Sequence, residues 1–255
     1  MAISVVRLSD HLELESAFWA PELMAAWPEF MRHDPTAFLY YGVGYFERFR
    51  DFALAVVDDE RPALVVGRAF SVPFVFGAAA GRDELPDAGW DAVIRWADED
   101  ERSGRAPNAV SALEVLLHLS VAGRGLSSVV LDAMRANAAR LGFRDLYAPV
   151  RPNEKHLEPE TPIGDYVRRM RGDGLPADPW LRVHVRAGGK IVKVAPSSMT
   201  IPGSLDQWRT WTGLAFDADG PTLVPGALNP VHVSVAQDHA VYVEPNVWVH
   251  HKTRL

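Results

Sequence analysis

The chain has 255 residues and a formal net charge of −7, and 48% of its residues are hydrophobic and 23% charged, as is usual for a globular protein with a sizeable core. The negative charge argues against broad binding to nucleic acid or to a membrane surface, and the lack of cysteine excludes disulfides, thiolate metal sites and a cysteine nucleophile. Because we find neither a run of about 18 apolar residues nor a signal peptide in residues 1–10, we expect a cytoplasmic protein.

The first hundred residues predict a helical segment followed by a hairpin. Residues 11–32 mix helix-forming stretches with aromatic side chains. The apolar runs 52–57 and 63–76 are separated by a polar turn and are typical of two antiparallel strands. Residues 90–98 follow as a short helix.

A strand, a glycine turn and a helix come next. Residues 111–119 form an apolar run, and apolar residues at spacings of three and four then predict a helix over 129–141 that Gly142 ends. With the short strand 145–150, this order predicts a parallel crossover unit. The start of such a helix, with its free N–H groups, suits a phosphate-bearing ligand. The residues of this turn are Gly123, Arg124, Gly125, Leu126, Ser127 and Ser128.

The last third of the sequence favours β structure. Apolar and polar residues alternate over 181–186. After a short turn, the run 191–194 would return as the second strand, so the two segments predict a hairpin. A second strand pair is expected at 231–235 and 240–243. We find no clear linker, so residues 1–255 are predicted to form one domain. Its fold class is α/β, with a mixed, mostly antiparallel central sheet that is flanked by helices and continued by the hairpin 181–194.

Several histidines and arginines in this part carry no predicted function. Arg182, His184 and Arg186 share one face of the expected strand, and we interpret them as a solvated sheet face. His250 and His251 would point to opposite faces of a strand, so we expect a solvated tail there. The sequence therefore predicts no metal site.

The order and residues of these elements resemble the GNAT superfamily of acyl-CoA-dependent N-acyltransferases. The pyrophosphate loop of that family reads Gln or Arg, two residues, Gly, one residue, then Gly or Ala. Here the matching frame runs from Ala122 to Ser127, with alanine at the leading position and serine at the last. The strand end Arg151-Pro-Asn153 resembles the strand-end asparagine of the family. The resemblance covers roughly residues 50–155 and implies a GNAT-like fold with acetyl-CoA or another acyl-CoA as co-substrate.

The resemblance also implies where the acyl donor lies. The pyrophosphate would lie on the turn 123–128, where backbone N–H groups converge and Arg124 adds a cation. The pantetheine arm would pair like an added β-strand with Leu116, Leu117 and His118. Asn153 resembles the family residue that contacts the same arm.

Acyl transfer further requires that the amine lose a proton and that the departing thiolate gain one. Glu114 is the only carboxylate on its predicted strand, so it is the candidate general base, directly or through water, with His118 as an alternative. Tyr166 is the nearest candidate for the proton donor to sulfur. Trp180, Trp208 or Trp211 would wall the acceptor pocket.

Three functions remain open at this point. The first is an enzyme that moves an acetyl or other acyl group from an acyl-CoA thioester to a primary amine of a small metabolite. The second uses an acyl-CoA or acyl carrier for other chemistry, such as O-acylation or decarboxylation. The third is a non-catalytic CoA-binding sensor, which the altered positions Ala122 and Ser127 keep open. Neither nucleic acid nor a membrane is an expected partner, and the sequence leaves open whether the chain forms a homodimer.

Overall fold

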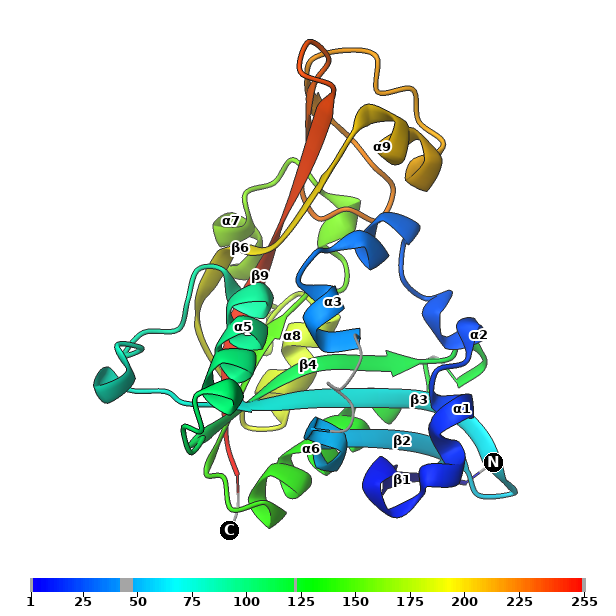
Figure 1. The fold of residues 1–255 in the computed structure, drawn as a ribbon, viewed down its shortest axis with the longest axis vertical. Coiled ribbons are helices and arrows are strands. Elements are labelled where there is room, and N and C mark those ends of the chain that lie inside the picture. The colour runs from blue at the N-terminus through cyan, green and yellow to red at the C-terminus, as the bar shows by residue number, and fades with distance from the viewer. Residues whose placement is uncertain (1, 42–47, 122, 254–255) are drawn as a thin grey trace.

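The structure is a computed structural model that describes residues 2–41, 48–121 and 123–253. In these residues nine strands form one sheet, and their bounds are β1 Ile3–Arg7, β2 Ala53–Asp58, β3 Arg61–Phe74, β4 Ala109–Leu117, β5 Asp145–Val150, β6 Lys190–Gly203, β7 Gly220–Thr222, β8 Val231–Ser234 and β9 His239–Lys252. The order across the sheet is β1-β2-β3-β4-β5-β9-β8-β7, and β6 pairs with β9 off this path (Figure 1).

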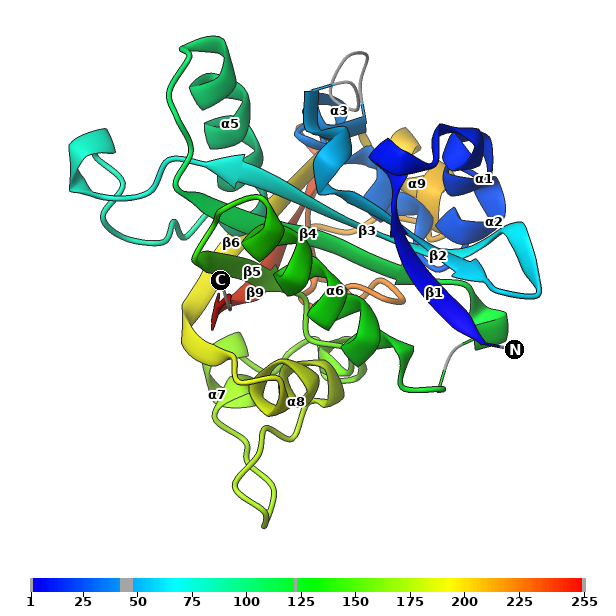
Figure 2. The same ribbon diagram turned by 90° about the horizontal axis from the view of Figure 1, so that it is seen from below.

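Helices cover both faces of the sheet (Figure 2). They are α1 Glu15–Phe18, α2 Pro21–Met24, α3 Ala37–Tyr41, α5 Gly89–Arg102, α6 Leu126–Arg140, α7 Ile163–Val167, α8 Pro179–Arg186 and α9 Leu205–Thr212. α6 and α8 lie on one face, and the N-terminal helices and α5 lie on the other. Within the described ranges, no helix is both long and apolar enough to cross a bilayer.

The predicted fold class is confirmed, and so are the central elements. β2 and β3 form the expected hairpin, and α5 follows as a longer helix than predicted. β4 and β5 are parallel and are joined through α6, as the crossover pattern required. Every other strand pair in the described residues is antiparallel. β1, which pairs with β2, was not predicted.

The predicted hairpin 181–194 is wrong, because its first arm is the helix α8. Asp178 begins this helix: its Oδ1 accepts hydrogen bonds from the backbone N–H groups of Trp180 (2.9 Å) and Leu181 (3.0 Å). Pro179 occupies the first helical position, where it is well tolerated. The helix start at Asp178 and Pro179 therefore decides the structure here. The same alternation of apolar and polar residues also fits a helix that buries Leu181 and His184 on one face.

The interpretation of Arg182, His184 and Arg186 as a solvated strand face is therefore wrong as well, and so is the expected solvated tail at His250 and His251. Both histidines lie in β9, between β5 and β6. His250 Nε2 is 2.6 Å from Asp145 Oδ1. His251 is fully buried on the opposite face.

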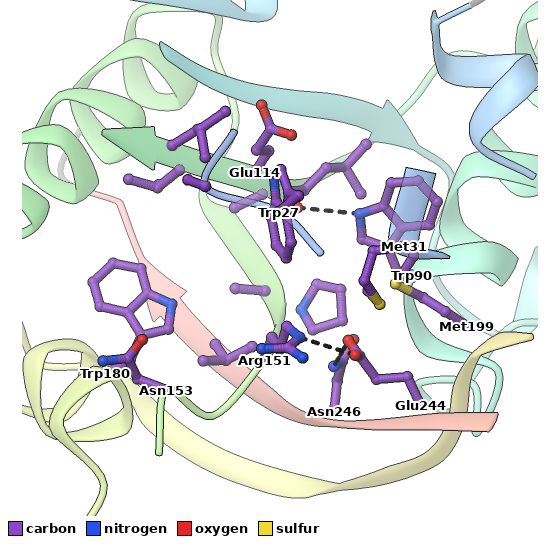
Figure 3. A pocket seen from close by; sticks show the side chains of 18 of the residues that line it. Trp27, Met31, Trp90, Glu114, Arg151, Asn153, Trp180, Met199, Glu244 and Asn246 are labelled. Carbon is purple, nitrogen blue, oxygen red and sulfur yellow. Dashed lines mark hydrogen bonds and ion pairs between the residues drawn. The ribbon is translucent and has the colours of Figure 1, made fainter. Parts of the chain in front are cut away.

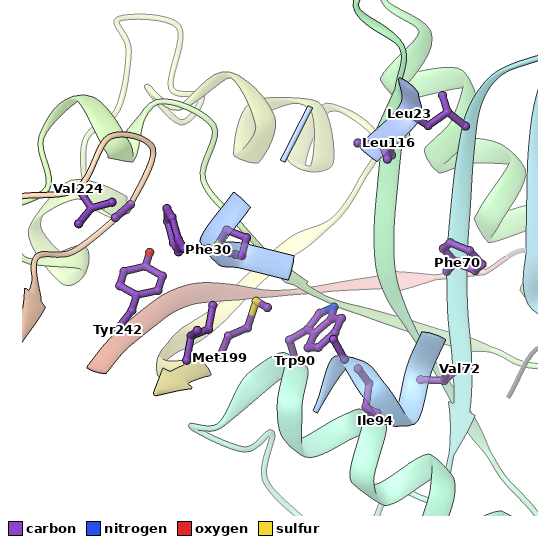
Figure 4. Close-up of a cluster of buried hydrophobic side chains, with 14 of the residues drawn as sticks. Leu23, Phe30, Phe70, Val72, Trp90, Ile94, Leu116, Met199, Val224 and Tyr242 are labelled. Atoms are coloured by element: carbon purple, nitrogen blue, oxygen red, sulfur yellow. The ribbon is translucent and has the colours of Figure 1, made fainter. Parts of the chain in front are cut away.

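A cluster of large apolar side chains fills the face of the sheet that the N-terminal segment and α5 cover (Figure 4). Its members come from distant parts of the sequence, among them Phe30, Phe70, Trp90, Leu116 and Tyr242. A second cluster lies between the sheet and α6. The two clusters fix the helices on either side of β4 and β5.

A pair of buried carboxyl groups joins the N-terminal segment to α5. Asp34 and Asp91 are each 3% exposed, and their carboxyl groups contact each other. The backbone N–H of Thr36 donates to Asp34 Oδ1 (2.7 Å), and Arg95 Nη2 lies 3.4 Å from Asp91 Oδ2. Burial, and then the charge of Asp34, raise the pKa of Asp91 to about 8, and burial also raises the pKa of Asp34. The pair therefore shares a proton at neutral pH.

Candidate active site

β4 and β5 separate after two paired positions, and a cavity opens between them. Val110 faces Leu146 and Ser111 faces Tyr147, after which the register ends. Just beyond this point Leu113 forms a β-bulge, because consecutive residues Ser71 and Phe70 of β3 face Ala112 and Glu114. The Leu113 carbonyl accepts a hydrogen bond from Trp90 Nε1 (3.1 Å). The cavity has a volume of about 640 Å³.

Side chains from both faces of the sheet line this cavity (Figure 3). On the face of α6 they are largely apolar: Leu117, Leu131, Met134, Trp180 and His184. On the opposite face they include three tryptophans and a carboxylate: Trp19, Met24, Trp27, Met31, Trp90 and Glu114. The cavity therefore passes through the sheet between the two strands.

Glu114 lines the cavity, where the sequence predicted the general base, and it is buried against Arg68. The Nε of Arg68 donates to Glu114 Oε1 (2.7 Å), and both side chains are almost fully buried. Arg68 Nη1 also donates to the Phe18 carbonyl (3.1 Å), and its guanidinium lies 5.0 Å from the Trp19 ring centroid. The ion pair fixes the orientation of the Glu114 carboxyl group.

A second charged group in the cavity was missed by the sequence analysis. Arg151 Nε donates to Glu244 Oε2 (2.9 Å), and the guanidinium lies 5.9 Å from the Trp27 ring centroid. Fully buried Glu244 also accepts from Tyr242 Oη (3.0 Å) and from Asn246 Nδ2 (3.2 Å). A glutamate inside the apolar run of β9 was the available signal, because such a group is buried only with partners.

The residues predicted to hold the pantetheine arm are only partly brought together. Leu116, Leu117 and Asn153 line the cavity. His118 lies just after β4 and is not among the lining residues. Its backbone N–H donates to the Val66 carbonyl (2.9 Å), and its Nδ1 lies 2.7 Å from Ser120 Oγ.

The predicted phosphate turn, 123–128, runs into the first turn of α6, whose Leu131 and Met134 line the cavity. Gly123 and Gly125 have φ values of +74° and +73°, which favour glycine. Gly125 is the N-cap of α6, and no side chain caps the helix there. The other turn residues, Arg124, Leu126, Ser127 and Ser128, surround this helix end, whereas Ala122 lies outside the described residues. The Ser128 hydroxyl donates to the Gly125 carbonyl (2.8 Å).

Tyr166 lies in α7 and is not among the residues that line the cavity. Its hydroxyl donates to Asp178 Oδ2 (2.9 Å), and burial, together with this hydrogen bond, raises its pKa. Its role as proton donor to sulfur stays a prediction that this placement does not support. Three tryptophans were predicted to wall the acceptor pocket. Trp180 lines the cavity, but from the face of α6, whereas Trp208 and Trp211 pack together in α9.

No family model matches the chain. The sequence is 33% identical over 253 residues to the arginine N-acetyltransferase avaD of Aspergillus versicolor, and the alignment covers 90% of this chain and 86% of the other. Among solved structures, the loading GNATL domain of CurA from Lyngbya majuscula has a TM-score of 0.54 and 16% identity, with 99% and 98% of the two chains covered. The GphF GNAT-like decarboxylase in complex with isobutyryl-CoA has a TM-score of 0.51 and 18% identity, with both chains covered completely.

The fold and the divided strand pair thus define a GNAT-type protein, as the sequence resemblance implied. Because its likeness to an N-acetyltransferase extends over nine-tenths of its length, the chain belongs to the GNAT superfamily and is an acyl-CoA-dependent N-acyltransferase. Among the described residues, no three His, Asp or Glu side chains are grouped to hold a metal ion.

Proposed function

We propose that this enzyme transfers an acetyl or other acyl group from the CoA thioester to the primary amine of a small metabolite. The observation that carries the proposal is the cavity between β4 and β5, which is lined from both faces of the sheet. A donor that enters from the face of α6 and an acceptor that enters from the opposite face would meet between the two strands.

On the face of α6, the proposed donor site uses backbone groups. The uncapped N-terminus of α6 offers N–H donors to the pyrophosphate on the turn 123–128. Beyond Ser111, β4 has no ladder with β5, so its backbone is open to the pantetheine amides at Leu116 and Leu117. Asn153 borders the same gap.

On the opposite face, Glu114 is the proposed general base. It accepts the amine proton directly or through water, and the amine nitrogen then attacks the thioester carbonyl carbon. The carbon–sulfur bond breaks with its electron pair on sulfur, and the thiolate takes up a proton. Arg68 holds the carboxylate toward the cavity throughout.

Arginine is the first acceptor to test, because the relative of 33% identity bears the name of an arginine N-acetyltransferase. Arginine carries a carboxylate and a cation. The Arg151–Glu244 pair places one charge of each sign at the cavity, and Arg151 suits bidentate contact with a carboxylate. Trp27, beside Arg151, offers an aromatic face to a cation.

An amine panel with acetyl-CoA tests this function. We expect release of free thiol that depends on the amine, together with an acylated product in mass spectrometry. Carbon dioxide release from a malonyl thioester without an amine would instead indicate decarboxylation. CoA binding without thiol release under any amine would indicate a sensor.

Two glycine variants test the phosphate site. Gly125→Ala and Gly142→Ala place a Cβ at the two ends of α6, with φ values of +73° and +89° and no other atom within 4 Å. Both should cost about 1–2 kcal/mol of stability. Only Gly125→Ala should weaken CoA binding, measured by calorimetry. Equal CoA affinity in the two variants would contradict the placement.

A further inference from the structure

A buried histidine of α8 faces the cavity from the side assigned to the acyl donor. His184 is 2% exposed and is among the lining residues, together with Trp180 one turn earlier. The two rings pack edge to face with their centroids 4.5 Å apart. His184 was predicted to have no function, and it takes no part in the steps proposed above.

His184 is paired with a second buried histidine. Its Nδ1 lies 2.9 Å from Nε2 of His251, which belongs to β9. Burial lowers the pKa of His184 to about 3, and burial together with the charge of Arg135 lowers the pKa of His251 to about 4. Both rings are therefore neutral at pH 7, and one hydrogen lies between the two facing nitrogens.

The surroundings of His251 determine which of the two rings carries the hydrogen that lies between them. Its other nitrogen, Nδ1, is buried and has no hydrogen-bond partner among the described residues. A hydrogen on this nitrogen would be a buried donor without an acceptor, which proteins avoid more strictly than an unused acceptor. The hydrogen of His251 therefore sits on Nε2 and is donated to Nδ1 of His184.

This arrangement fixes the tautomer of His184. Since its Nδ1 accepts, its own hydrogen must be on Nε2. His184, which lines the cavity, thus carries its N–H donor on Nε2, the ring nitrogen that is not paired with His251, and the ring stays neutral. A neutral imidazole is a very weak acid, so it can stabilise negative charge by a hydrogen bond but does not give up its proton.

We propose that the Nε2–H of His184 donates a hydrogen bond to the negative charge that develops on the acyl donor, at the thioester oxygen or the departing sulfur. The inference rests on the proposed function. When the amine nitrogen attacks and the carbon–sulfur bond breaks, charge passes through the oxygen onto sulfur, while His184 keeps its proton. A fixed donor in an apolar site stabilises such charge strongly. His251 is a positioning residue that sets the tautomer.

Four variants test this inference. His184→Phe removes the donor and should lower kcat by about 10²-fold or more, with the Kd of acyl-CoA almost unchanged. His184→Gln, whose amide can replace the Nε2 donor, should recover part of the lost kcat. His251→Phe should lower kcat by a smaller factor, because the tautomer is no longer fixed. His250→Phe, the next residue on β9 and facing away from the pair, is the matched control and should retain the kcat of the wild type.

Nitrogen NMR of the wild-type protein gives an independent readout. We expect hydrogen on Nε2 of both His184 and His251 and a bare Nδ1 on each. In addition, if the bond is made to sulfur, His184→Phe should weaken binding of CoA more than that of desulfo-CoA, whereas equal effects assign it to the oxygen.

Two results would overturn the inference: an unchanged kcat in a folded His184→Phe protein, or hydrogen on Nδ1 of His184. A wild type that releases no thiol with any amine would refute the proposed function instead. Thermal unfolding of each variant shows whether a lost rate comes from a lost fold.

Discussion

Replacing Asp91 by asparagine should flatten the dependence of stability on pH. Asp91 shares a proton with Asp34, and its pKa lies near 8 rather than at the ordinary 3.8. Between these two values the native protein binds a proton that the unfolded chain has released. Stability conferred by this proton is therefore complete at low pH and is lost as pH rises toward 8.

The magnitude follows from this single proton. One proton bound only by the native state changes the free energy of unfolding by about 1.4 kcal/mol per pH unit. From pH 5.5 to 7.5, the wild type should lose up to about 2–3 kcal/mol through this pair. Asp91→Asn carries no titrating group at this position, and its amide can still donate to Asp34, so it should keep its stability over the same range.

Urea unfolding at several pH values measures both curves. Asp87→Asn serves as control, because this exposed aspartate meets Lys193 outside the pair, and its curve should follow the wild type. If Asp91→Asn and the wild type lose the same amount of stability as the pH rises, the hypothesis that Asp34 and Asp91 share a proton is wrong.

Glu114→Gln should lower kcat by about 10²-fold with little change in acyl-CoA affinity, and a wild-type rate would mean that another group is the base. Because Arg68 loses its counter-charge in this variant, the assay must run well below the measured Tm. Lys155→Met should lower the urea-derived stability by about 2–4 kcal/mol, since it leaves three carbonyls without their donor. Gly189→Ala places a Cβ 2.5 Å from the His251 ring; we expect about 1–3 kcal/mol of destabilisation and a shifted His251 signal in NMR, and an unchanged spectrum would contradict the packing.

Local patterns predicted the centre of the sheet well. The alternating and apolar runs of β2, β3, β4 and β5 carry their own boundaries, and the glycine turn marks the start of α6. The strand predicted at 181–186 was wrong, because over only six residues an alternation of apolar and polar residues fits a helix as well as a strand. There the Asp178-Pro179 pair was the decisive signal.

The candidate site was predictable only where it lies within one segment. Glu114, Leu116 and Leu117 share β4, and Asn153 follows the next strand, so their place at the gap could be inferred from chain order. The other half of the site depends on β9, which lies between β5 and β6. A contact such as that between Arg151 and Glu244 spans 93 residues, and no local pattern specifies it.

The opening through the sheet has a kinetic consequence. In the proposed function, donor and acceptor approach from opposite faces, so neither blocks the entrance of the other. Steady-state rates should then fit a sequential mechanism without mutual exclusion. An inhibitor in which CoA is covalently joined to the amine cannot bind its two halves independently. One half must pass between β4 and β5 before both halves can bind. Such a conjugate should therefore associate slowly and, once seated, leave slowly as well.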